Sequence, residues 1–200
     1  MKKLFFTAIL VFGTTSLIQA QSELAFGIKG GVNFSNLTGD GVDGFNDDNA
    51  RTSFNLGAVL EIPVTERFAV QPEVFYSGQG FDLVQRDDAQ DTEFQLNYIN
   101  VPVLAKIYLV QGLYLEAGPQ VGFLVDSKID GPNATIGLDE DNFNDIDFAG
   151  AVGVGYKFNG GLFLNARYTQ GFSDVYDSGE GNGFDAKNGV FVASVGFSFN

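Results

Sequence analysis

The chain has 200 residues, with 25 acidic and 11 basic side chains, a formal net charge of −14, and neither histidine nor cysteine. The absence of histidine excludes hydrolases that use a histidine base, and the absence of cysteine excludes thiol catalysis and disulfides. The chain is acidic and has no cluster of basic residues of the kind that binds nucleic acid. We therefore expect neither an enzyme nor a nucleic-acid partner.

Residues 1–20 have the organisation of a secretory signal peptide. Lys2 and Lys3 form a positive start, an apolar run covers residues 4–12, and Ala20 supplies a small residue before the expected cleavage site. A transmembrane anchor is the alternative, but it needs about 18 consecutive apolar residues, which this run does not reach. The sequence thus predicts a signal peptide at 1–20 and one domain at 21–200.

Apolar and polar residues alternate in the segment that follows. One face would carry Phe26, Ile28, Val32 and Phe34, and the other Gly27, Lys29, Gly31, Asn33 and Ser35. A period of two is typical of a strand with one dry and one wet face. The pattern recurs and predicts eight strands at 24–36, 52–62, 68–80, 94–107, 113–126, 146–158, 162–173 and 189–199.

The connections between these segments are alternately long and short. The short ones, at 63–67, 108–112 and 159–161, are rich in turn residues, whereas the long ones are acidic. Outer-membrane barrels alternate short periplasmic turns with longer extracellular loops. We predict an all-β, eight-stranded, antiparallel, up-and-down transmembrane β-barrel in the outer membrane of a Gram-negative bacterium. Its acidic loops would be extracellular and its termini periplasmic.

A soluble barrel with the apolar face inside is the alternative fold. The polar face argues against it, because that face carries many charges. These are Lys29, Glu61, Glu73, Lys106, Glu116, Asp126, Asp147, Lys157 and Arg167. Buried charges must be paired or hydrated, so we expect the five acids and four bases to form an ion-paired network that plugs the lumen. A narrow polar conduit is the other interpretation.

One acidic connection is a weak calcium candidate. Asp139, Asp141 and Asp145 lie at alternating positions, as at the start of an EF-hand loop. The turn glycine of that motif is replaced by Asn144, and no helices are expected on either side. A solvated acidic loop is therefore the preferred interpretation, and no cofactor is expected.

Three segments resemble a known family. Residues 27–35 (GIKGGVNFS), 96–106 (LNYINVPVLAK) and 114–122 (YLEAGPQVG) resemble strands of the PorT-like small outer-membrane β-barrels of Bacteroidota. The resemblance implies contact with outer-membrane lipid and assembly by the barrel-insertion machinery. Phe197 and Phe199 partly match the assembly signal, although the chain ends on Asn200. A type IX secretion role attaches to the family name, but no residue here carries it.

The expected function follows from location more than from chemistry. We expect a monomeric integral outer-membrane barrel with a structural or surface-interaction role and a lumen plugged by side chains. The alternatives are a narrow channel for small solutes or ions, and an accessory component of a secretion or envelope complex. The partner protein is unknown.

Overall fold

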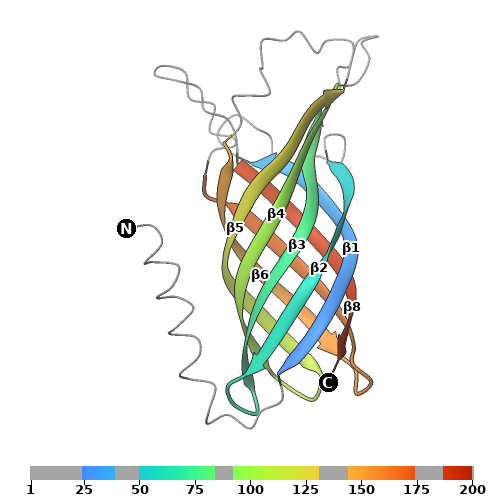
Figure 1. Cartoon of the computed structure of the whole chain (residues 1–200), viewed down its shortest axis with the longest axis vertical. Coiled ribbons are helices and arrows are strands. Elements are labelled where there is room, and N and C mark those ends of the chain that lie inside the picture. The colour runs from blue at the N-terminus through green and yellow to red at the C-terminus, as the bar shows by residue number, and fades with distance from the viewer. Residues whose placement is uncertain (1–23, 39–49, 84–91, 131–143, 174–186, 200) are drawn as a thin grey trace.

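The computed structural model describes residues 24–38, 50–83, 92–130, 144–173 and 187–199. They form eight strands, β1 (Ala25–Thr38), β2 (Arg51–Pro63), β3 (Phe68–Leu83), β4 (Thr92–Tyr108), β5 (Leu113–Asp130), β6 (Ile146–Lys157), β7 (Leu162–Gly171) and β8 (Lys187–Phe199). Each strand pairs antiparallel with its neighbours in chain order, and β1 pairs with β8 (Figure 1). The predicted eight-stranded antiparallel barrel is therefore confirmed. Within these ranges no helix is long and apolar enough to cross a membrane.

The two ends of the barrel differ. At one end, here called the turn end, short turns join β2 to β3, β4 to β5 and β6 to β7 (Figure 1). Backbone hydrogen bonds close these turns, such as Leu109 N to Leu113 O at 2.9 Å. Gly112 and Gly161 adopt positive φ angles of 84° and 88° there, which favour glycine. At the opposite end, here called the loop end, β1 ends at Thr38 and β3 ends at Leu83, and Phe199 lies at the turn end opposite Phe26.

The apolar face of the sheet points outward. Val103 and Val154 are 47% and 43% exposed, while Lys29 and Arg167 on the inner face are 2% and 1% exposed. A water-soluble barrel would show the reverse arrangement, because large contiguous apolar surfaces are not left in water. This outer surface suits lipid, so the soluble alternative is rejected.

Three neighbouring strands extend further at the loop end than the sequence predicted. β3, β4 and β5 contain 16, 17 and 18 residues, whereas β7 contains 10. Pairing continues to Leu83 opposite Thr92 and to Glu93 opposite Asp130. The alternation fades there because backbone pairing does not require an apolar face once the strand leaves lipid.

One predicted lumen residue lies elsewhere. The register between β4 and β5 shifts between Asn97 and Tyr98, so Leu124 lies opposite Tyr98 and Asp126 lies opposite Asn97. Tyr98 is 1% exposed and faces inward. A bulge inserts one residue, which moves all later side chains to the other face. Asp126 is consequently exposed and pairs with Lys128 at 3.4 Å, so its assignment to the lumen was wrong.

Adjacent glycines of β1 have different surroundings. A Cβ built on Gly31 would collide with the backbone of Ala193 and Ser194 in β8. A Cβ built on Gly30 would meet only Asn55 O at 3.4 Å and a Leu56 methyl group at 3.5 Å. Close approach of β1 and β8 therefore requires glycine at position 31, whereas position 30 has room for a Cβ atom.

Candidate functional site

Glu73 of β3 lies at the centre of the lumen. Lys29 Nζ donates to its Oε2 at 2.5 Å, and Arg167 donates from both terminal nitrogens at 2.9 and 2.8 Å. The three side chains come from β1, β3 and β7, and each residue is at most 4% exposed. The two-pronged contact is one that a guanidinium makes and an ammonium cannot.

Arg167 also reaches a second carboxylate. Its Nε donates to Glu116 Oε1 of β5 at 2.8 Å, and Asn165 Nδ2 donates to the same oxygen at 3.2 Å. One arginine therefore joins two carboxylates across the lumen, and all of these groups are shielded from solvent.

A second charged cluster lies nearer the turn end, around Glu61 of β2. Lys106 Nζ donates to its Oε2 at 2.7 Å, Lys157 Nζ to its Oε1 at 3.1 Å, and the Tyr108 hydroxyl to Oε2 at 2.9 Å. Lys106 Nζ also lies 3.8 Å from the ring centre of Tyr114, a cation–π contact.

Gln71 connects the two clusters. Its Nε2 donates to Glu73 at 2.6 Å, and its Oε1 accepts from Lys106 at 3.0 Å. The result is one connected set with side chains from β1 to β7, which we call the lumen charge network. Its members are Lys29, Glu61, Gln71, Glu73, Lys106, Tyr108, Glu116, Lys157, Asn165 and Arg167.

Neutral side chains form a second polar layer toward the loop end. Ser194 of β8 donates to Asn55 of β2 at 3.0 Å, and Asn55 donates to Asn33 of β1 at 2.7 Å. Asn33 in turn donates to Ser77 of β3 at 3.0 Å. β8 thus contributes to the neutral layer, and the charged residue of this strand, Lys187, lies at its loop end and outside the lumen charge network.

Seven of the nine charged residues named for the predicted network lie in it, and Asp126 and Asp147 do not. Asp147 accepts one hydrogen bond, from Asn188 Nδ2 at 3.2 Å. Of the calcium candidates, Asp145 is exposed, whereas Asp139 and Asp141 lie outside the described residues, as does the predicted signal peptide. The part of the chain that the structure describes contains no group of three or more acidic residues able to hold a metal ion.

Sequence reasoning missed three network members, Gln71, Tyr108 and Asn165, because they are neutral and only charges were counted. Their positions held a usable signal. Each lies two residues from a predicted inward charge on the same strand, and residues two apart share a face.

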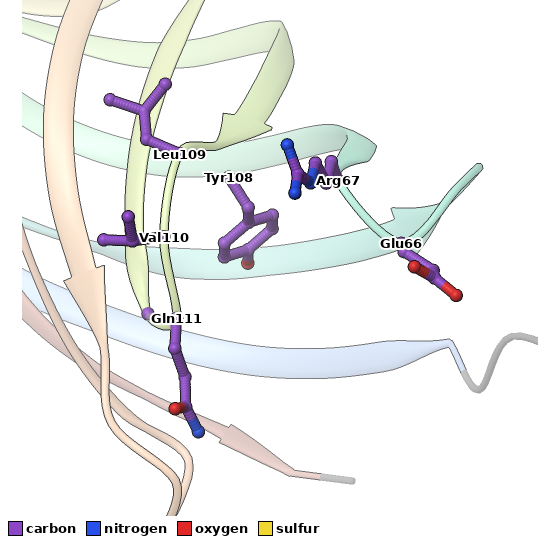
Figure 2. A pocket seen from close by; sticks show the side chains of 7 residues that line it. Glu66, Arg67, Tyr108, Leu109, Val110 and Gln111 are labelled. Carbon is purple, nitrogen blue, oxygen red and sulfur yellow. The ribbon is translucent and has the colours of Figure 1, made fainter.

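A separate pocket of about 320 Å³ lies at the turn end, between the turns that follow β2 and β4. Figure 2 shows Tyr108 in its middle, with Arg67 and Gln111 on either side. The pocket is open, and the Tyr108 hydroxyl is already bonded to Glu61. It supplies no converging set of catalytic groups.

A closed barrel with an apolar exterior and buried charged side chains inside is the architecture of a small outer-membrane protein. The sequence model of the outer membrane protein beta-barrel domain matches residues 19–177, and the chain belongs to this family. No curated protein matches the sequence.

Solved structures resemble the chain in fold. Neisserial surface protein A is 12% identical, with a TM-score of 0.57 over 89% of this chain and 100% of that one. The attachment invasion locus protein Ail of Yersinia pestis, in complex with the heparin analogue sucrose octasulfate, is 16% identical. Its TM-score is 0.51, over 88% of this chain and 99% of that one. At these identities the likeness concerns the fold alone.

Proposed function

We propose that this outer-membrane barrel has a structural or surface-interaction role and that its lumen is closed by its own side chains. The observation that carries the proposal is the lumen charge network. It joins side chains of seven strands into one set, with Arg167 only 1% exposed at its centre. An eight-stranded barrel has an interior just wide enough for such side chains to fill. The absence of histidine and cysteine supports a non-catalytic role.

Conductance in a planar lipid bilayer tests the closed lumen. We expect the purified, folded protein to show no steady single-channel steps, because Glu73 and Arg167 are held by several bonds across the lumen. Steady steps whose size changes in the variant Glu73→Gln would show instead that ions pass this carboxylate. The narrow-channel function would then replace the proposal.

The charge of the chain suggests the kind of surface partner. Ail was crystallised with a sulfated, polyanionic ligand, whereas this chain has a net charge of −14. Like charges repel, so a cationic or neutral partner suits this surface better. Affinity purification from native membranes tests this, with enrichment of basic surface molecules expected.

Membership of the PorT-like branch, and with it an accessory role in a secretion complex, is supported by the three motifs at 27–35, 96–106 and 114–122. These motifs encode strands, so they support membership of the PorT-like family more than they support a particular molecular function. Recovery of the same envelope proteins with the tagged barrel in independent purifications would favour the accessory role, and recovery of the barrel alone would not.

A further inference from the structure

The pocket at the turn end has both charged and apolar walls. Its volume of about 320 Å³ lies at the lower end of the range for small-ligand sites. Leu109 and Val110 line it and are exposed although they are apolar. The polar members of the lining are Glu66, Arg67, Tyr108 and Gln111. A ligand that matches this lining carries charge at one end and apolar groups at the other.

Two of the lining side chains carry opposite charges and are not joined to each other. Arg67 and Glu66 are both exposed, and the ion pairs within the described residues include neither of them. Figure 2 shows the guanidinium and the carboxylate directed away from each other. A ligand can therefore engage both groups without breaking an ion pair of the protein. A guanidinium binds a phosphate through two parallel N–H donors, and a carboxylate accepts hydrogen bonds from an ammonium group.

The backbone holds the two turns of this pocket together. Tyr108 N donates to Arg67 O at 2.8 Å, and Arg67 N donates to Thr65 Oγ1 at 3.3 Å. The Tyr108 side chain is fixed in turn by its hydroxyl, which donates to Glu61 at 2.9 Å. Arg67 is thus attached to a wall that is already in place, which lowers the cost of ordering the site when a ligand binds.

The lipid-facing surface of β4 leads directly to the pocket. Val103 and Ile107 point outward and are about half exposed. Leu109 N donates to Leu113 O at 2.9 Å, so strand pairing continues by one residue beyond Tyr108. Side chains two residues apart share a face, and exposed Leu109 therefore extends the outward row to the edge of the pocket. An acyl chain that lies along this row places its head group beside Arg67.

We propose that the turn-end pocket binds the head group of a zwitterionic phospholipid, with the phosphate on Arg67 and a primary ammonium group on Glu66. The acyl chains lie along the row that contains Ile107 and Leu109. A free phosphate would use Arg67 but would leave Leu109 and Val110 in water, so the lining favours the lipid. The site requires lipid around the barrel, as the proposed function does, but it does not depend on a closed lumen.

Native mass spectrometry of the folded, full-length barrel tests the site. The barrel is released from mixed micelles that contain equal amounts of phosphatidylethanolamine and phosphatidylcholine. We expect a single retained phosphatidylethanolamine, in clear excess over phosphatidylcholine, because the trimethylated ammonium of the latter has no N–H to donate to Glu66. Arg67→Gln should reduce lipid retention about tenfold, as expected when a charged hydrogen bond is lost. Glu66→Gln should retain lipid but lose the preference between the two head groups.

The control removes a cation from the other end of the barrel. Lys128→Gln alters a side chain that is 60% exposed at the loop end, and it should retain phosphatidylethanolamine as wild type does. Because Arg67 and Glu66 are exposed in a turn, both variants should show the electrophoretic mobility of the folded barrel. Equal retention by Arg67→Gln and wild type, an equal loss in Lys128→Gln, or no preference between the lipids in wild type would each overturn the proposal. Displacement of the lipid by inorganic phosphate would overturn it as well, in favour of a site for soluble phosphate.

Discussion

Arg167 is the side chain on which the two halves of the central cluster depend. It contacts Glu73 through two nitrogens and Glu116 through a third. Glu73 retains Lys29 if the guanidinium is lost, whereas Glu116 retains, among the described residues, the hydrogen bond from Asn165. The consequence of removing it is a buried carboxylate without a cationic partner.

Arg167→Ala should therefore lower the free energy of unfolding by about 3–5 kcal/mol, the range for breaking a buried ion pair. Reversible denaturant unfolding in lipid vesicles measures it. Lys128→Ala is the matched control, because the Lys128–Asp126 pair has side chains 60% and 45% exposed. It should cost about 0–1 kcal/mol. Similar small losses for both variants would show that water replaces the arginine.

The two glycines of β1 give a second residue-scale prediction. Gly31→Ala should lower the free energy of unfolding by about 1–3 kcal/mol, the range for overpacking, because the added methyl group meets the backbone of β8. Gly30→Ala, its neighbour, should be close to neutral because the same methyl makes ordinary contacts. The same unfolding assay compares them, and equal effects would contradict the close approach at Gly31.

At this scale the sequence was informative about which charges face inward and less so about their bonds. The alternation of side chains along each strand correctly placed Lys29 and Arg167 inside the barrel. The alternation failed at Asp126, because a bulge moves the following side chains to the other face and leaves no clear signal in the sequence. Nor could it separate Asp147 from the other acids, because cross-lumen distances depend on strand register and tilt.

At the scale of the element, the strands were predictable because lipid outside and charge inside impose a strict alternation. The predicted bounds of β2 and β8 differ from the observed ones by two residues or fewer at each end. The ends of β3, β4 and β5 were underestimated at the loop end, where water lies on the outside and the selection for apolar residues ceases.

The lipid-facing surface of the strands yields the third prediction. Val103→Arg and Val154→Arg should each cost about 2–4 kcal/mol of folding stability in bilayers, the range for arginine near the midplane. Val64→Arg is the control, since Val64 is 55% exposed but lies in a turn outside the strands. Its cost should be about 0–1 kcal/mol, the range near the interface. Near-zero changes in folding stability at both strand positions would argue against contact of this surface with lipid.

For the whole molecule, the unequal ends of the barrel predict its orientation. Asp145 lies at the loop end and Gly160 in a turn at the opposite end, and both are exposed. A cysteine in place of Asp145 should react with a membrane-impermeant maleimide in intact cells. A cysteine in place of Gly160 should react only after the outer membrane is opened. Since the natural chain has no cysteine, wild type gives the blank, and the opposite labelling pattern would reverse the orientation.

The absence of an interior charged residue from β8 has a consequence for biogenesis. β8 meets β1 along thirteen residue pairs, and its one charged residue is Lys187 at the loop end. Separating this seam breaks backbone hydrogen bonds and the neutral contact between Ser194 and Asn55, but no ion pair of the interior. A nascent sheet of β1 to β7 can therefore assemble its ionic centre first. The final strand then completes the barrel through backbone and neutral contacts and forms no ion pair of the interior.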